Sequence, residues 1–351
     1  MWPESYSVGW DVGGAHLKMA WVDDAGRVRD VAQFTTPLWR GLDCLRAAMG
    51  RAVERLPPAG GRHGITMTGE LVDLFGSRRE GVAALAALMG GALSSPPLRF
   101  YAGPRGFVAA EAAVSLHPWV ASANWHATAA LAAECLEAGL LVDVGSTTAD
   151  VVPFAAGRVT ARGYSDGERL ALEELLYTGV SRTPLMALGE AVPFKGEWVG
   201  VVAEQFAHTA DVYRLLGRLP ALADVDDTAD GRGRTRDETM ARIARMVGMD
   251  VGEAPPQAWH GLAAYFAGRQ LDRLQRACAR HLSAGLPAHA PLVGAGVGRF
   301  LVRDLAALLD RPFVDIAELM EHTGAGAEAA DCASAVAVAM LMAREPVACP
   351  A

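Results

Sequence analysis

Short apolar runs separated by tight turns open the chain. Residues 6–12 and 19–22 are largely apolar on either side of a turn at Gly13-Gly14, and a third such run spans 28–34. Apolar runs of this length, bounded by glycine and aspartate, are typical of β-strands. The pattern therefore predicts three consecutive antiparallel strands joined by short turns.

The same pattern returns later in the chain. The apolar run at 140–144 contains Asp143 and leads into Gly145, and two further short runs follow at 151–154 and 159–162. Asp-Val-Gly-Gly at 11–14 thus has a counterpart in Asp-Val-Gly-Ser at 143–146. We interpret this repeat as an internal duplication. It predicts an α/β fold in which two ribonuclease-H-like domains face a central cleft.

Apolar residues at helical spacing fill the segments between these strands. They predict helices at 41–56, 78–92, 107–115, 168–178, 202–217 and 258–284, a helix that ends near 138, and a final apolar helix. Short strands are expected at 64–68 and 98–101. Residues 226–237 are the most polar stretch and are expected to form a surface loop or the base of a lid.

These elements define the expected domain organisation. A chain of 351 residues is too long for one ordinary core and indicates two domains of roughly 150 residues each. We expect the first domain to comprise 1–137 plus 328–351. The second is expected to comprise 138–327, with a helical insert or lid around 185–285.

Composition and charge narrow the classes of partner. The chain is 51% hydrophobic and 21% charged, which is typical of a globular protein. Its net charge of −8 argues against a nucleic-acid partner, which requires a basic face. A small anion held with Mg²⁺ stays compatible with this charge.

The cysteines and the hydropathy pattern indicate the compartment. The five cysteines are odd in number, widely spaced and contain no CxxC pair, as expected for a reduced cytoplasmic protein without structural zinc. No apolar run reaches transmembrane length, and the start of the chain shows no signal-peptide pattern, so no membrane partner is expected. The sequence leaves open whether the protein forms a homo-oligomer. The cysteines are Cys44, Cys135, Cys278, Cys332 and Cys349.

Each Asp-Gly hairpin contains the groups that a phosphate and metal site requires. Asp11 and Asp143 follow apolar strands, and carboxylates at such positions hold Mg²⁺ while turn N–H groups bind phosphate oxygens. A strand-end aspartate in a simple β-turn is the alternative for either hairpin alone, and a solvated lysine is the alternative for Lys18. The duplication of the hairpin favours a phosphate and metal site over a simple β-turn. Its candidate phosphate-binding residues are Gly13, Gly14, Lys18, Gly145, Ser146, Thr147 and Thr148.

Later motifs add weaker candidates. Gly294 and Gly296 lie in a glycine-rich turn that precedes a predicted helix, which suits an anion or adenosine site, although close strand–helix packing also selects glycine. Glu70 and Asp166 are candidate bases, with surface turn acids as the alternative. Candidate substrate contacts are Asn124, Trp125 and Arg182, with a helix N-terminus and a solvated arginine as the alternatives.

The order of these motifs resembles the superfamily of acetate and sugar kinases, Hsp70 and actin. More specifically, the chain resembles the hydantoinase/oxoprolinase-related branch linked to tetrahydromethanopterin one-carbon metabolism. It departs from the pattern of that branch at His16 and Gly69. The stretches that carry the resemblance are 11–18, 68–75, 122–129, 143–150, 177–184, 210–213 and 227–231.

The resemblance implies a transferase of methanofuran or methylofuran biosynthesis. Such an enzyme joins an aminomethylfuran-methyl diphosphate to the phenol oxygen of a glutamyl-tyramine or tyrosine and releases pyrophosphate. It implies Mg²⁺ at Asp11 and Asp143, with ATP not expected as a substrate. Two alternatives stay open: an ATP-dependent small-molecule kinase or hydantoinase-like hydrolase, and a non-catalytic ATP-binding scaffold. Tight binding of ATP or ADP at 294–298, with ATP turnover, would exclude the transferase.

Overall fold

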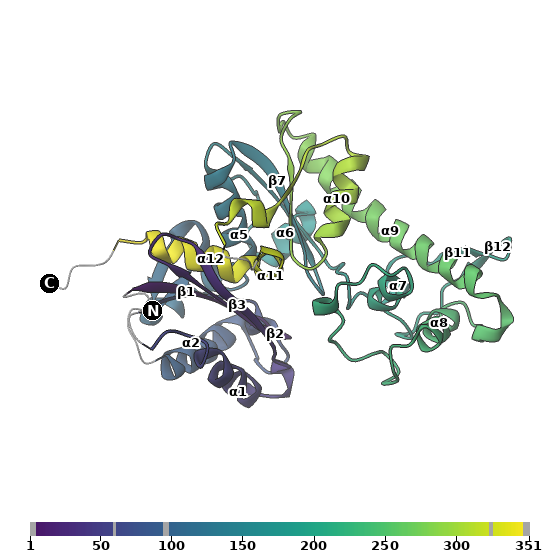
Figure 1. The fold of residues 1–351 in the computed structure, drawn as a ribbon, viewed down its shortest axis with the longest axis horizontal. Coiled ribbons are helices and arrows are strands. Elements are labelled where there is room, and N and C mark those ends of the chain that lie inside the picture. The colour runs from purple at the N-terminus through teal and green to yellow at the C-terminus, as the bar shows by residue number, and fades with distance from the viewer. Residues whose placement is uncertain (1–4, 59–60, 94–97, 323–325, 347–351) are drawn as a thin grey trace. The chain divides into compact units, whose positions relative to one another are not determined.

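The computed structural model describes residues 5–58, 61–93, 98–322 and 326–346 (Figure 1). The chain divides into two compact units. Unit 1 comprises Met1–Leu141, Val152–Leu172 and Val314–Ala351, and unit 2 comprises Val142–Val151 and Glu173–Phe313. Among the described helices, none combines the length and the apolar character that a membrane span requires.

The six-stranded sheet of unit 1 opens with the three predicted strands. Its strands are β1 (Tyr6–Val12), β2 (His16–Asp23), β3 (Val28–Thr35), β4 (Gly61–Met67), β5 (Leu98–Tyr101) and β6 (Phe107–Ala109). They lie in the order β3-β2-β1-β4-β5-β6. β1, β2 and β3 pair antiparallel, whereas β4 is parallel to both β1 and β5. The carboxyl ends of β1 and β4 therefore meet at one edge of the sheet.

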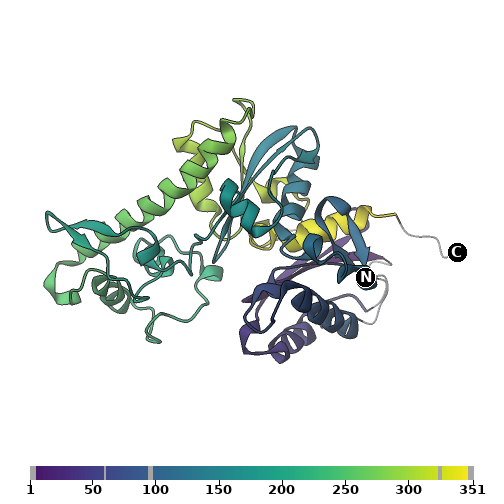
Figure 2. The ribbon, with the colours of Figure 1, turned by 180° about the vertical axis from the view of Figure 1, so that it is seen from behind.

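Helices cover both faces of this sheet. Figures 1 and 2 show the C-terminal helix α12 (Ala333–Arg344) on one face, and α1 (Leu42–Val53) and α2 (Arg78–Ala92) on the other. The approach of α12 to β1 depends on Gly9, since a Cβ there would lie 1.9 Å from the Ala335 carbonyl oxygen. The remaining helices of unit 1 are α3 (Ala110–Ala113), α4 (His117–Val120), α5 (Asn124–Cys135), α6 (Asp166–Leu172) and α11 (Gly326–Asp331).

The second sheet repeats the strand order of the first. It is built from β7 (Ala138–Val144), β8 (Ala149–Ala155), β9 (Arg158–Val159), β10 (Leu175–Leu176), β13 (Leu292–Ala295) and β14 (Phe313–Asp315). Its order is β10-β8-β7-β13-β14, with β9 also paired to β8. The hairpin β7–β8 and the later strands thus occupy the places of β1–β2 and β4–β5. This repeat confirms the predicted duplication of a ribonuclease-H-like unit.

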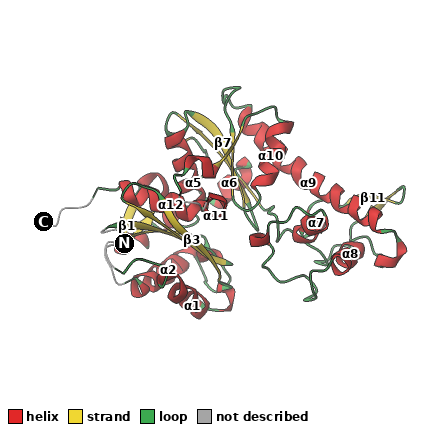
Figure 3. Cartoon of the chain, in the orientation of Figure 1, coloured by secondary structure: helices red, strands yellow, loops and turns green. Residues whose placement is uncertain are grey.

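Unit 2 also contains a helical region with its own apolar core. It consists of α7 (Thr209–Leu215), α8 (Arg236–Arg245), α9 (Pro256–Leu282) and the hairpin of β11 (Ala191–Phe194) and β12 (Glu197–Gly200), and α10 (Arg299–Leu308) follows β13. Figure 3 shows α9 as the longest of these helices. Trp259 and Phe266 of α9 pack with Ile243 of α8 in this core.

Several predicted elements differ from the observed ones. Residues 107–115 form β6 and the short α3 instead of one helix, because Phe107–Ala109 pair with β5. The helix predicted at 168–178 ends at Leu172, and β10 follows it; the helix predicted at 202–217 begins only at Thr209. β11, β12 and α8 were not predicted. Local periodicity cannot register a strand partner that is distant in sequence.

The predicted domain bounds, 1–137 plus 328–351 and 138–327, stay a prediction. The two compact units instead divide β7 and β8 between them. Cys44, Cys135, Cys278 and Cys332 are free thiols. The reduced state of the protein stays a prediction. Cys349 lies outside the described residues.

Candidate active site

Asp11 and Lys18 form a cross-strand pair at the carboxyl end of β1. They are directly opposite each other in the antiparallel β1–β2 ladder, so their side chains share one face. Asp11 is buried, and burial raises the pKa of its carboxyl, while Lys18, the Ser334 hydroxyl and the Asn124 amide act to lower it. Oδ1 of Asp11 has no hydrogen-bond partner of normal geometry among the described residues.

The C-terminal helices complete this arrangement. The Ser334 hydroxyl donates a hydrogen bond to Asp11 Oδ2 over 2.5 Å. The Lys18 ammonium donates to the carbonyl oxygen of Asp331 over 2.9 Å. Neither partner was predicted from the sequence. Ser334 is a polar residue near the start of the alanine- and valine-rich helix α12, whereas Asp331 at the end of α11 contributes a backbone carbonyl, which residue type does not reveal. Their contacts leave Asp11 Oδ1 as the oxygen suited to a cation.

The first glycine turn is packed closely against its surroundings. Gly13 donates its N–H to the His16 carbonyl over 3.0 Å, and a Cβ at Gly13 would lie 2.8 Å from that oxygen. A Cβ at Gly14 would lie 2.8 Å from Val72 Cγ1. Both positions therefore favour glycine for steric reasons. Phosphate binding by Gly13 and Gly14 stays a prediction.

Glu70 is a buried acid at the end of the neighbouring strand. It follows β4 in a short 3₁₀ turn at Gly69–Leu71 and is 1% exposed. Burial raises the pKa of its carboxyl to about 7, against the lowering influence of the Ser122 hydrogen bond and of Arg78. Ser122 donates to Oε1 over 2.9 Å, while Oε2 has no hydrogen-bond partner among the described residues. A carboxyl in this state is able to accept a proton near neutral pH.

The surrounding backbone holds Glu70 in place. Ser122, which donates to it, has a φ of +51°, a conformation that costs energy in a residue with a side chain. On the other side, a Cβ at Gly81 of α2 would lie 2.7 Å from Glu70 Cα. Glycine at 81 therefore allows α2 to contact the turn directly. Neither signal is visible in sequence spacing.

Asp166, the second candidate base, lies in an ion pair. Its Oδ2 accepts a hydrogen bond from Arg78 over 2.6 Å, and its charge acts to raise the pKa of Glu70. Because Asp166 already pairs with a guanidinium, Glu70 is the more suitable base of the two.

The predicted contacts Asn124 and Trp125 begin α5. Asn124 lies beside Asp11, as its effect on that carboxyl indicates. Trp125 is 2% exposed; the guanidinium of Arg169 lies 3.9 Å above its ring, and the Tyr164 ring lies 5.7 Å away. Trp125 thus supports the site from inside the core, and direct contact of Trp125 with substrate stays a prediction. Arg169 was not identified from the sequence.

The second hairpin turn lies on a shelf formed by residues 179–182. Val180 donates its N–H to Gly145 O, and the N–H groups of Ser181 and Arg182 donate to Ser146 O over 3.2 and 3.0 Å. Arg182 Nη1 lies 3.5 Å from Thr147 Oγ1. The turn itself is closed by Gly145 N–H and the Thr148 carbonyl over 2.9 Å. Arg182 therefore lies at the predicted phosphate turn. Its contact with substrate stays a prediction.

The late glycines contact this hairpin directly. A Cβ at Gly296, whose φ is +75°, would lie 2.4 Å from Asp143 Oδ1. A Cβ at Gly294 would lie 2.7 Å from the Phe313 ring. Close packing therefore accounts for glycine at both positions, which is the alternative named above. Anion or adenosine binding there stays a prediction.

The structure thus groups the candidates by unit. Unit 1 brings Asp11, Lys18, Glu70, Asn124 and Asp166 to the carboxyl edge of its sheet, and unit 2 brings Asp143, the turn at 145–148, Arg182 and the late glycines together. Metal binding by Asp11 with Asp143 stays a prediction. Within the described part of the chain, no three His, Cys, Asp or Glu residues are grouped as metal ligands.

Two relatives of this chain share a name. A (4-{4-[2-(gamma-L-glutamylamino)ethyl]phenoxymethyl}furan-2-yl)methanamine synthase of Methanocaldococcus jannaschii is 29% identical over 244 residues, covering 69% of this chain and 72% of the relative. The synthase of the same name from Methanococcus vannielii is 36% identical over 114 residues, covering 32% of this chain and 51% of the relative.

Fold and family comparisons agree with the motif order. The nucleotide-free structure of an ATP-dependent acetone carboxylase superposes with a TM-score of 0.59 at 12% identity, over 95% of this chain and 70% of that one. The chain therefore has the ribonuclease-H-like fold of actin, Hsp70 and sugar kinases, as predicted. The hydantoinase/oxoprolinase family model matches residues 62–345, most of the chain. The predicted family is confirmed: this protein belongs to the hydantoinase/oxoprolinase family.

Proposed function

We propose that this protein is a transferase that forms an aryl ether in methanofuran or methylofuran biosynthesis. Its substrates are an aminomethylfuran-methyl diphosphate and the phenol of a glutamyl-tyramine or tyrosine. The similarity to the Methanocaldococcus jannaschii synthase over 244 residues supports this reaction, since the name of that relative contains the phenoxymethyl-furan linkage.

The observation that carries the proposal is the state of Glu70. A phenol has an ordinary pKa near 10, so its attack at neutral pH requires a base. Glu70 has a pKa of about 7 and an Oε2 without a partner among the described residues. We assign it as the base that takes the phenol proton, and we assign Asp166 the role of orienting Arg78 beside it.

The diphosphate requires positive charge and N–H donors. Lys18, on the same face as Asp11, supplies a cation in unit 1, and Arg182 supplies one at the 145–148 turn of unit 2. Each of these cations would stabilise negative charge on a phosphate group bound beside it.

A divalent cation fits the acidic residues present. Asp11 carries a buried carboxyl whose Oδ1 has no partner of normal geometry within the described chain, and Mg²⁺ commonly binds through one or two carboxylates together with substrate phosphates. Asp11 in unit 1 and Asp143 in unit 2 are each a proposed carboxylate ligand for such an ion. When bound, Mg²⁺ would neutralise charge on the diphosphate.

The proposed step balances as a substitution at carbon. The bond between the furan methylene and the diphosphate oxygen breaks, and a bond from that carbon to the phenol oxygen forms. The phenol proton moves to Glu70 Oε2, and pyrophosphate leaves with the bonding electron pair. The electron-rich furan ring stabilises positive charge at the methylene carbon, so the bond to the diphosphate can break before the phenol attacks. Alignment of the two substrates would then supply much of the rate.

The test is pyrophosphate release from a furanylmethyl diphosphate, measured with and without tyramine, glutamyl-tyramine or tyrosine. The proposal expects release with Mg²⁺ that depends on the phenol, together with an ether product detected by mass spectrometry. Phosphate release from ATP without any ether product would instead identify a kinase or hydrolase. ATP binding with neither product would identify a scaffold.

A further inference from the structure

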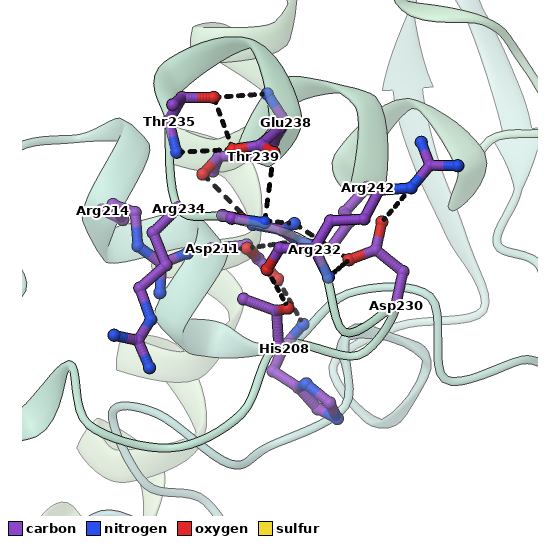
Figure 4. A network of polar contacts seen from close by, with 12 residues as sticks. His208, Asp211, Arg214, Asp230, Arg232, Arg234, Thr235, Glu238, Thr239 and Arg242 are labelled. Atoms are coloured by element: carbon purple, nitrogen blue, oxygen red, sulfur yellow. Dashed lines mark hydrogen bonds and ion pairs between the residues drawn. The ribbon is translucent and has the colours of Figure 1, made fainter.

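A buried arginine binds the polar segment at 226–237 to the helical region of unit 2. Arg242 of α8 is 0% exposed, and its guanidinium donates to Asp211 Oδ1 over 2.8 Å, Asp230 Oδ1 over 3.1 Å and the Gly233 carbonyl over 3.0 Å (Figure 4). A buried guanidinium with these partners fixes the backbone on both sides of it. The segment predicted as a surface loop or lid base is therefore attached at its centre to the helical region.

Further ion pairs fix the beginning of this segment. Arg214 donates to Asp211 over 2.8 Å and to Asp224 over 2.6 Å. Arg234 reaches back across the segment and donates to the carbonyl oxygen of Asp226 over 2.7 Å. These contacts place Asp226 at a defined position.

Asp226 in turn contacts the shelf below the hairpin turn. Its Oδ2 accepts a hydrogen bond from the Ser181 hydroxyl over 3.0 Å. The N–H groups of Ser181 and of the next residue, Arg182, both donate to Ser146 O. A continuous set of contacts therefore runs from Arg242 through Asp226 and Ser181 to the predicted phosphate turn.

The start of α7 holds the shelf from its other end. Thr209 donates its N–H to Thr183 O over 2.9 Å, and Ala210 N–H lies 3.3 Å from Ser181 O. The backbone of Ser181 is thus fixed by α7, whereas its hydroxyl is fixed by Asp226. The two supports are separate, so one can be removed without the other.

We propose that Asp226 is a positioning residue for the anion site at the 145–148 turn, acting through Ser181 to hold Arg182 and the shelf N–H groups against Ser146. This inference rests on the proposed function, which places a diphosphate at this turn. It also assigns a role to the polar segment: a fixed support of the site, in place of a lid.

Because Asp226 is an acid, its charge and its hydrogen bond are expected to change anion affinity in opposite directions, which makes the proposal testable. A carboxylate near an anion site repels the anion, so removal of the charge alone strengthens anion binding. Removal of the hydrogen-bond acceptor loosens the shelf and weakens binding. Asp226→Asn removes the charge and keeps an acceptor oxygen, whereas Asp226→Ala removes both.

The experiment measures binding of inorganic pyrophosphate with Mg²⁺ to the full chain by calorimetry. We expect Asp226→Ala to weaken binding about three- to tenfold, the range of one ordered hydrogen bond. Asp226→Asn is expected to bind as tightly as the unchanged protein or more tightly. The neighbouring exposed Asp227→Ala serves as the matched control and should leave binding unchanged.

A ligand-free measurement separates this inference from the proposed function. Hydrogen exchange of the Ser181 and Arg182 amides should accelerate in Asp226→Ala and in Ser181→Ala to a similar extent, without a further increase in the double variant. Tighter pyrophosphate binding by Asp226→Ala, or unchanged exchange, overturns the positioning role. Accelerated exchange in a protein that binds no pyrophosphate supports the positioning contact and overturns the diphosphate site.

Discussion

The Ser122 hydroxyl donates a hydrogen bond to Glu70 Oε1 over 2.9 Å, from a backbone with a φ of +51°. The two residues belong to loops that follow different elements, β4 and α4. The contact occupies one carboxyl oxygen and leaves Oε2 without a partner among the described residues. A buried acid held in this way by a strained residue is typical of a functional site.

Glu70→Gln should stabilise the fold at high pH. The folded pKa of Glu70, about 7, exceeds its ordinary value of 4.5, so folding stability decreases as pH rises from 4.5 to 7 and the full cost is present above pH 7. Glutamine has no such cost and still accepts from Ser122. Unfolding by urea should show the variant more stable than the unchanged protein by roughly 2–3 kcal/mol at pH 8, and by much less at pH 5.

The same variant should lose activity. Without the base, kcat for ether formation should fall about 10²- to 10⁴-fold, and the rise of the rate with pH through about 7 should disappear. Asp73→Asn, at an exposed acid close to Glu70 in sequence, serves as control for both measurements. An unchanged pH profile in Glu70→Gln would falsify the assignment of the base.

Ser334→Ala should destabilise the protein in a pH-dependent way. The substitution removes the hydroxyl that donates to buried Asp11 Oδ2, so the pKa of Asp11 should rise further. The loss should be about 1–3 kcal/mol where Asp11 of the folded protein is charged, and should be smaller at low pH, where the folded carboxyl is protonated and the hydroxyl no longer stabilises a negative charge. Thermal unfolding at pH 4 and pH 8 measures this.

The exposed hydroxyl of Ser115, which donates to Ala112 O, provides the control for Ser334. Ser115→Ala should change stability by less than about 0.5 kcal/mol at either pH. Equal destabilisation of Ser334→Ala at both pH values would mean that the hydroxyl acts by packing and not through the carboxylate.

Arg242→Met should strongly destabilise unit 2. It leaves Asp211 and Asp230 without the guanidinium that they share in a buried position, which costs about 3–5 kcal/mol. Arg245, on the same helix, is 40% exposed and lies 3.9 Å from Asp230, so Arg245→Met should cost less than about 1 kcal/mol. Urea unfolding of the two variants tests the difference, and similar values would contradict the central position of Arg242.

Gly179→Ala should disturb the second hairpin turn. Its Cβ would lie 2.3 Å from Ser146 O, so the shelf must move away from the turn that it supports. We expect pyrophosphate binding to fall at least tenfold, since the Ser181 and Arg182 N–H groups would lose their acceptor. Calorimetric titration measures the change.

Gly200→Ala is the matched control for Gly179, because no atom lies within 4 Å of a Cβ at that position. It should leave pyrophosphate binding unchanged. Binding by Gly179→Ala at the affinity of the unchanged protein would show that the turn does not depend on the shelf.

The local sequence determined the elements with the strongest patterns. The helix predicted at 78–92 is α2 residue for residue, and both Asp-Gly hairpins form as expected. Their apolar periodicity and turn residues act over a few positions, so they can be seen without knowing the fold. The repeated hairpin also indicated two related sheets, and the observed strand orders agree.

Only the tertiary structure decided which polar residues contact the candidate site residues. Ser334 contacts Asp11 from more than 300 positions away in the sequence, and Ser122, in a loop that follows α4, contacts Glu70. Arg242 binds Asp211 through its buried guanidinium and so helps to hold the polar segment before α8 in place. The late glycines, which suggested an anion site, contact Asp143 and Phe313 closely. Composition and spacing do not encode such pairs, because each depends on chain segments brought together when the apolar faces of sheets and helices are buried.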